Sequence, residues 1–281
     1  PGEDVSGETN HFSESGFSAT YPSDQATDTP TTNYPTFLNP VCPTSANVTI
    51  SEGNMKIVAT GESDVGIWPF GTLTGGKYFC QWDFTDNGSA GNCRFGFGPP
   101  DSWDGASFGV VDTDTFSVDH RNDYWRFGST TEDAGNPGAT GRYACAFDID
   151  AGKAWFGLVN TGDGTITWYD DANGETGDPA AGTNETGTFT AGTPLIHWHY
   201  IGLSAGTSWT VYADFGQFGF DNSVVPSGFL AINTKTITAP TCEISRDYFD
   251  TFTYEGNAST RSLTDLNSGF TPDLVIIKNR F

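Results

Sequence analysis

The sequence predicts an all-β protein built as an antiparallel β-sandwich, and three observations lead to this prediction. Glycine is abundant, at 35 of 281 residues, whereas methionine occurs once. Phenylalanine, tyrosine and tryptophan make up 14% of the chain, and such side chains fit a pleated, half-buried surface. Many short apolar runs are separated by turn-forming residues, which is typical of a sandwich or a barrel. A chain of this length can bury a sizeable core.

The clearest strand pattern lies between residues 77 and 98. Tyr78, Cys80, Trp82 and Phe84 occupy alternate positions, so they share one face of a strand. A turn-rich stretch follows and then a second apolar run at 93–98, and the two runs are expected to pair as a long hairpin. Further strands are expected at 47–51, 55–59, 143–147, 154–159, 195–203 and 209–215.

The chain divides into three predicted regions. Residues 1–32 are polar and turn-rich, which predicts a linker or the tail of an upstream domain. Residues 33–238 form the predicted sandwich. Residues 239–281 are expected to start a second β-rich module, with strands at 248–254 and 272–278. About 35 residues cannot bury an independent core, so we expect more chain or a partner to complete this part.

The chain is strongly acidic, with 35 acidic against 12 basic residues and a net charge of −23. This charge repels phosphate backbones and anionic membranes, so we expect no nucleic-acid partner. No apolar run approaches the ~20 residues of a membrane span, so we expect no membrane insertion. Solubility is the simplest role of such a charge, because repulsion prevents edge-to-edge pairing of β-rich proteins. Cation binding among the acidic loops is the alternative.

The chain has five cysteines, an odd number at irregular spacing, which does not indicate a disulfide framework. Cys80 and Cys93 flank the turn-rich stretch and could face each other across the predicted hairpin. Buried free thiols are the favoured state. No Cys/His spacing typical of zinc occurs.

Several phrases of the chain follow one another in a specific order. They are DTPTTNYPTFLNP (28–40), NVTISEGNMKIVATG (47–61), GGKYFCQWDF (75–84), CRFGFGPP (93–100), YACAFDIDAGKAWFGLVN (143–160), GDPAAGTN (177–184), ADFGQFGF (213–220) and PSGFLAINT (226–234). Together they resemble the SPRY-like module of bacteriophage tail and tail-fibre proteins. Residues 3–17 resemble the end of an upstream lectin-like module, so that the region 1–32 is a linker or the tail of that module. Residues 247–280 resemble the start of the module that commonly follows, and residues 120–142 depart most from the pattern.

The resemblance implies a SPRY or concanavalin-like jelly-roll sandwich with flanking extended segments, in an extracellular virion appendage. It implies a structural protein that helps attach the virion to host-surface glycans. Other virion proteins would be its partners, together with further copies of itself in a homo-oligomer, for which a trimer is one form. No enzymatic activity and no cofactor are expected. A free extracellular carbohydrate-binding module and a polysaccharide-degrading enzyme remain as alternatives.

Aromatic residues in predicted loops are the candidate ligand-binding groups. The flat apolar face and polar rim of such side chains suit sugars, and recognition is expected in loops at one end of the sandwich. The alternative is that each ring packs beneath its own loop. The candidate residues are Trp103, Tyr124, Trp125, Arg126, Trp168 and Tyr169.

Metal sites are weakly indicated. His197 and His199 lie two residues apart on one strand face, but no carboxylate follows closely, so we expect both to face the polar side. Asp148 and Asp150 are predicted to form a hairpin turn, since further calcium ligands are missing. The same weak calcium alternative applies to Asp101, Asp104, Asp112 and Asp114.

Catalytic residues are not expected. A glycosidase needs paired carboxylates, and the nearest match, Glu62 and Asp64, has Ile67 in the third place. No nucleophile elbow or phosphate-binding loop is present.

Overall fold

The computed structural model describes part of the chain, in two units, Pro1–Thr236 and Ile237–Phe281. The expected boundary at residue 238 stays a prediction. Only the backbone is described at 64–67, 91–92, 124, 130–133 and 198–203. The described residues are 34–35, 48–52, 54–60, 64–67, 71–86, 91–101, 113–119, 124–128, 130–133, 140–203, 208–217, 224–236, 249, 251, 253, 255–256, 259–260 and 274–278.

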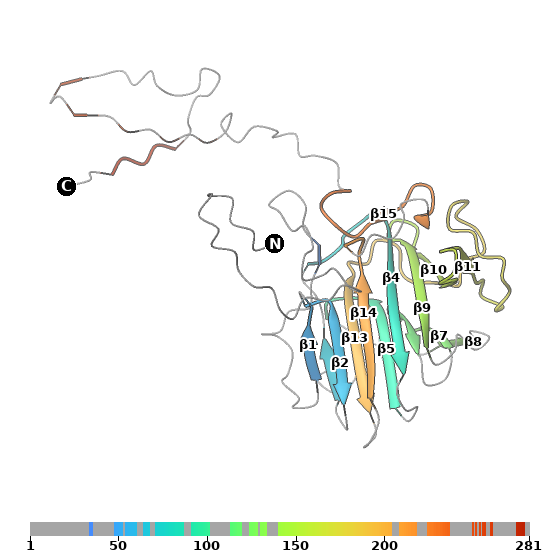
Figure 1. Ribbon diagram of the computed structural model, residues 1–281. Coiled ribbons are helices and arrows are strands. Elements are labelled where there is room, and N and C mark those ends of the chain that lie inside the picture. Colours follow the sequence, from blue (N-terminus) through green and yellow to red (C-terminus); the bar gives the residue numbers. More distant parts are fainter. Residues whose placement is uncertain are drawn as a thin grey trace. The chain divides into compact units, whose positions relative to one another are not determined.

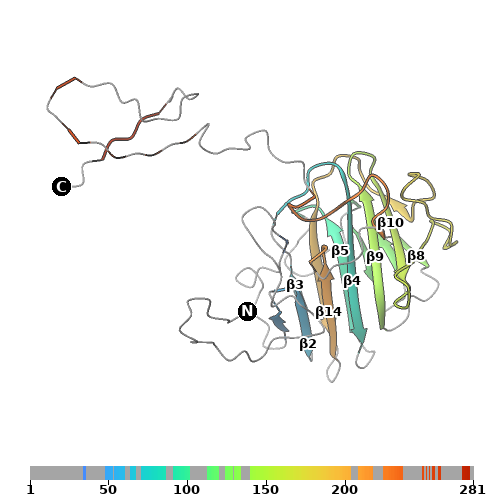
Figure 2. The ribbon, with the colours of Figure 1, turned by 45° about the horizontal axis from the view of Figure 1, so that its top comes forward.

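The first unit contains two stacked sheets (Figures 1 and 2), which confirms the predicted all-β, antiparallel sandwich. The main strands of the nine-stranded sheet are, in order, β1 (Val48–Ser51), β2 (Lys56–Thr60), β14 (Ser208–Asp214), β4 (Lys77–Asp86), β9 (Thr140–Asp148), β10 (Lys153–Val159) and β11 (Ile166–Trp168). Two short strands complete it, β12 (Gly187–Thr188) on β10 and β15 (Leu230–Ala231), which is parallel to β4.

The six-stranded sheet is antiparallel throughout. Its strands are, in order, β3 (Asp64–Ile67), β13 (Ile196–Leu203), β5 (Gly91–Gly98), β6 (Phe116–Asp119), β7 (Tyr124–Phe127) and β8 (Thr130–Asp133). The part of the chain that is described contains no α-helix. It therefore also contains no helix long and apolar enough to cross a bilayer.

The hairpin expected between residues 77 and 98 is wrong. β4 pairs with β14 and β9 in one sheet, whereas β5 pairs with β13 and β6 in the other. The apolar faces of the two strands meet across the core, where the rings of Trp82 and Phe95 lie 5.2 Å apart. Burying both faces in this way removes more apolar area from water than pairing the strands side by side would.

The positions of the cysteines follow from the same assignment of strands to sheets. Cys80 lies opposite Cys145 on β9, and not opposite Cys93, which lies in the other sheet. All three are buried free thiols, as the sequence predicts. Burial raises the pKa of each thiol well above its ordinary value, so these groups stay protonated and unreactive.

Aromatic side chains fill the space between the sheets. Trp82 and Phe84 point inward from β4, as the alternation predicts, and both are fully buried. His197 also lies in this core, because the indole nitrogen of Trp82 donates to its Nε2 at 2.7 Å and the two rings stack. The expectation that His197 faces the polar side is therefore wrong. The side chain of His199 lies outside the described part of the chain.

A smaller apolar cluster covers the outer face of the nine-stranded sheet. Trp155 belongs to it, packing edge-on against Phe229 with ring centroids 6.0 Å apart. The indole nitrogen of Trp155 donates to the carbonyl oxygen of Thr183 at 2.9 Å. Its neighbour Phe156 points into the main core instead. Trp155 is thus buried as predicted, but on the outer face of its sheet.

Replacing Trp155 with alanine should lower the free energy of unfolding by about 3–5 kcal/mol. The substitution leaves a cavity beside Phe229 and removes one of the two hydrogen bonds that the Thr183 carbonyl accepts. Urea unfolding followed by fluorescence and circular dichroism measures the change. Thr167→Ala, at an exposed position of β11, is the control and should stay within about 0.5 kcal/mol of the wild type. An unchanged unfolding curve for Trp155→Ala would contradict the packing.

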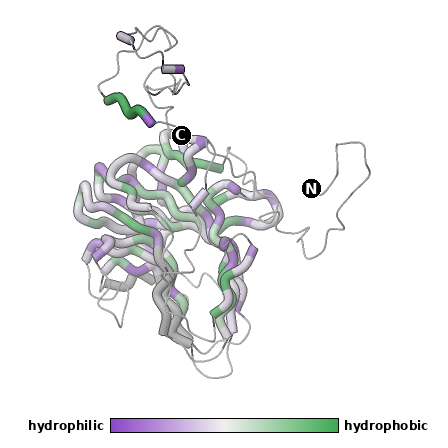
Figure 3. The backbone as a smooth tube through the Cα atoms, turned by 90° about the vertical axis from the view of Figure 1, so that its left-hand side faces the viewer, coloured by the Kyte–Doolittle hydropathy of each residue, from purple (hydrophilic) through white to green (hydrophobic). Residues whose placement is uncertain are grey.

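The structure describes the second unit only in part, so the strands expected at 248–254 and 272–278 stay predictions. Among the described residues of these ranges, 249, 251, 253 and 274–278 belong to no strand. Residues 274–277, the apolar run drawn in green in Figure 3, have exposed fractions between 63% and 84%.

Candidate ligand-binding hollow at one end of the sandwich

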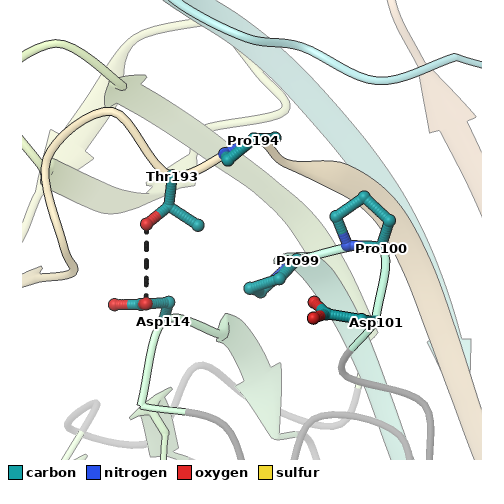
Figure 4. Close-up of a pocket in the computed structure, with 6 residues that line it drawn as sticks. All are labelled: Pro99, Pro100, Asp101, Asp114, Thr193 and Pro194. Carbon is teal, nitrogen blue, oxygen red and sulfur yellow. Dashed lines mark hydrogen bonds between the residues drawn. The ribbon is translucent and has the colours of Figure 1, made fainter.

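Three segments enclose a hollow of about 480 Å³ at the end of the sandwich where β5 ends and β6 and β13 begin. Figure 4 shows the carboxylates of Asp101 and Asp114 on its rim. This volume falls within the range of about 300–1,000 Å³ for small-molecule sites. The hollow is lined by Pro99, Pro100, Asp101, Asp114, Thr193 and Pro194.

Proline ends the strand that leads into the hollow. Pro99 and Pro100 directly follow Gly98, the last residue of β5. Because proline has no N–H group to donate, it cannot continue a sheet ladder. The ring also fixes φ, so this wall of the hollow is rigid.

Asp114 connects two walls. It lies two residues before β6, and its carboxylate accepts a hydrogen bond from the backbone N–H of Thr190 at 2.7 Å. The Thr193 hydroxyl donates to the same carboxylate at 3.5 Å (Figure 4). The segment before β6 is therefore tied to the segment before β13.

Backbone hydrogen bonds to two other segments also fix the segment before β13. Leu195 and Leu73 exchange two backbone hydrogen bonds of 2.8 Å, and Phe189 donates to the carbonyl of Gly152 at 2.9 Å. Gly152 has a φ of +66°, and a Cβ there would lie 2.3 Å from the Phe189 carbonyl oxygen. Only glycine fits this contact, which belongs to the predicted turn at 148–153. Asp148 and Asp150 accept backbone hydrogen bonds there, as expected of turn residues.

The hollow combines two kinds of surface. The proline rings offer apolar C–H surfaces, and the two carboxylates accept hydrogen bonds. Pro100, Asp101 and Pro194 are exposed, and Asp114 and Thr193 are half-buried, so a ligand can reach them. The arrangement can hold a compact molecule with an apolar face and a rim of hydroxyl groups.

Trp103 lies outside the described residues, as do Asp104 and Asp112. In the chain it follows Asp101 by two residues, within the segment that joins the two carboxylates of the hollow. Its proposed role in binding stays a prediction.

Trp125 does not lie in a loop, and that expectation is wrong. It lies in β7, has no exposed surface, and stacks on Phe156 with centroids 4.9 Å apart and planes 2° apart. Its indole nitrogen is buried and makes no hydrogen bond. The apparent loop residues around it are a strand whose alternate positions point inward, which places this ring in the core.

Arg126 is held by an ion-pair cluster on the outer face of the six-stranded sheet. Its Nε and Nη2 both lie 3.1 Å from Oδ2 of Asp119. Arg94 Nε donates to the same oxygen at 2.8 Å, and Asp119 is fully buried. The side chain of Tyr124 lies outside the described residues, and its backbone pairs with β6 and β8.

Trp103 and Tyr124 belong to segments on opposite sides of β6 in the chain. Residues 102–112 precede this strand, and residues 120–123 follow it. Both segments lie outside the described residues, so a single binding site formed by them at one end of the sandwich stays a prediction.

Trp168 and Tyr169 lie at the end of β11 and do not line the hollow. Trp168 packs edge-on against Phe79 on the outer face, with centroids 6.3 Å apart. Tyr169 lies 5.9 Å from Trp125. Burial, and then the charge of Glu175, raises the pKa of the Tyr169 hydroxyl. The structure thus brings Tyr169 and Trp125 together, although in packing rather than in a loop site.

Sequence reasoning missed Thr193 and Pro194. They are about ninety residues away from Asp101 in the chain, and no motif links the two places. The available signal was proline next to a predicted strand, at 99–100 and at 194. Asp101 and Asp114 were considered as calcium ligands, but the described residues contain no group of three or more potential metal ligands.

Comparisons with known proteins give structural neighbours only. No protein-family model and no curated protein sequence matches the chain. The SPRY domain of human HERC1 aligns at 10% identity and a TM-score of 0.43, over 63% of this chain and 96% of that one. The PSpry domain of TRIM65 aligns at 12% identity and a TM-score of 0.40, over 64% of this chain and 90% of that one. Stonustoxin aligns at 12% identity and a TM-score of 0.45, over 64% of this chain and 26% of the stonustoxin chain. Likeness at this level does not indicate function.

Proposed function

We propose that this chain is a structural module of a bacteriophage tail or tail fibre that binds host-surface glycans in the hollow at Asp101 and Asp114. The bacteriophage context is supported by the ordered phrases between residues 28 and 234, which resemble tail and fibre modules. The observation that carries the binding role is the hollow itself, with its mixed proline and carboxylate lining.

A glycan suits this lining better than other small ligands. The C–H face of a sugar ring can pack on Pro100 or Pro194, while its hydroxyl groups donate to the carboxylates. The walls are fixed by proline rings and by the Asp114 hydrogen bonds. A preformed site loses little conformational entropy on binding.

Binding in this hollow is short-range. A net charge of −23 provides no long-range attraction to an anionic bacterial surface. Each site is therefore weak, and multiple copies on one appendage raise the affinity by avidity. In this proposal the module acts on the virion, outside the cell, as part of a homo-oligomer in contact with other virion proteins.

The experiment fills the hollow with a bulky side chain. Thr193→Trp should weaken binding of the multivalently displayed protein to host cells or purified host polysaccharide at least tenfold, about 1.4 kcal/mol. Thr167→Trp is the matched control, because it adds the same side chain at an exposed site of β11, at the far edge of the nine-stranded sheet. The control should bind like the wild type, and the wild type should bind equally well when the salt concentration is raised.

Three outcomes would contradict this function. Equal binding by both tryptophan variants would show that the hollow is not the site. A wild type that binds no host polysaccharide would favour a purely structural spacer. Release of reducing sugar from the polysaccharide would favour the degrading enzyme.

A further inference from the structure

Among the described residues that line the hollow, the charged side chains are both acidic. Asp101 and Asp114 both place a carboxylate on its rim, and the other lining side chains are three prolines and Thr193. Thr193 supplies the single side-chain donor of this lining, and its hydroxyl already donates to Asp114. A negatively charged group on a ligand would therefore lie near two carboxylates of the same charge. The hydroxyl of Thr193 would have to give up its hydrogen bond to Asp114 in order to donate to that group.

Two lysines of the described sandwich form ion pairs with carboxylates outside the hollow. Lys77, the first residue of β4, lies 3.1 Å from the carboxylate of Asp148. Lys153, the first residue of β10, lies 3.1 Å from Glu185. Neither lysine lines the hollow.

Two arginines that the structure describes near the hollow segments in the chain form ion pairs elsewhere. Arg94 and Arg126 both bind Asp119, which ends β6, whereas the hollow adjoins the start of that strand. Among the described residues of the lining, the charged groups are therefore both negative, in keeping with the net charge of −23 of the whole chain.

We propose that the hollow selects uncharged sugars, such as hexoses and N-acetylhexosamines, and rejects acidic ones, such as uronic, sialic or phosphorylated sugars. This inference rests on the proposed glycan-binding function and names its ligand class. A neutral ring places hydroxyl donors against both carboxylates. An acidic sugar replaces one of those donors with a charge that the site repels.

The test uses one acidic bacterial polysaccharide in two forms, native and carboxyl-reduced, so that the uronic acids of the first become neutral hexoses in the second. Binding of the displayed wild type to immobilised polymer should be at least tenfold tighter for the reduced form. Asp101→Asn should lower the ratio of the two affinities, reduced over native polymer, at least threefold. The substitution removes the exposed carboxylate and leaves the Asp114 hydrogen bonds intact. Asp171→Asn makes the same change in net charge at an exposed loop position and should leave the ratio unchanged.

The outcomes separate the inference from the function on which it rests. Equal binding of both polymer forms by the wild type overturns the inference and leaves the glycan-binding function standing. If both asparagine variants lower the affinity ratio equally, the preference for neutral sugars arises from the total charge of the protein. That result overturns the role of the hollow. Binding of neither form, repeated with polysaccharides from several hosts, overturns the proposed function and the inference together.

Discussion

Replacing Trp125 with alanine is expected to lower the free energy of unfolding by about 3–5 kcal/mol, because it empties a fully buried aromatic site. The ring stacks on Phe156 at 4.9 Å and contacts Tyr143 and Tyr169 edge-on or tilted at 6.2 and 5.9 Å. The loss should appear as a lower urea midpoint with an unchanged slope.

A second substitution at the same position tests whether the aromatic ring is what stabilises the core. Trp125→Phe keeps an aromatic ring against Phe156 and removes the buried indole N–H that lacks a partner. It should therefore cost clearly less than Trp125→Ala. If Trp125→Ala instead kept the wild-type stability and lost ligand binding, the loop interpretation of this residue would be restored.

Replacing Asp119 with alanine is the other substitution with a large expected effect, a loss of about 3–5 kcal/mol. Asp119 is fully buried, and its Oδ2 accepts hydrogen bonds from both Arg94 and Arg126. The arginine side chains are 9% and 12% exposed. Without the carboxylate, two nearly buried guanidinium groups repel each other and have lost their shared acceptor. Thermal and urea unfolding both measure the change.

The matched control is the exposed pair of Asp83 and Arg142. These side chains lie 3.2 Å apart but are 27% and 37% exposed. Asp83→Ala should cost at most about 1 kcal/mol, as is usual for surface ion pairs. Similar losses at Asp83 and Asp119 would show that burial does not set the strength of the Asp119 cluster. Replacing Asp119 and both arginines together with apolar residues should recover much of the stability.

Part of the candidate site could be predicted from the sequence. The prolines at 99–100, next to an apolar strand, mark a strand end, and Asp101 and Asp114 were already recognised as possible ligands. The walls formed by Thr193 and Pro194 could not be predicted, because they reach the hollow only through the pairing of β13 with β5. The prediction for Trp125 was wrong because an aromatic residue next to an arginine gives the same local pattern in a short strand as in a loop.

The sequence by itself determined the longer strands of this protein and the turn at 148–153. The alternation of Tyr78, Cys80, Trp82 and Phe84, and the Asp- and Gly-rich turn at 148–153, depend on neighbours within a few residues, so local chemistry is sufficient. Only the tertiary structure decided which strands are neighbours, which face of a sheet is covered and which loops meet. β4 and β5 entered different sheets, and Trp155 was buried on an outer face, because the burial of apolar area depends on residues far apart in the chain.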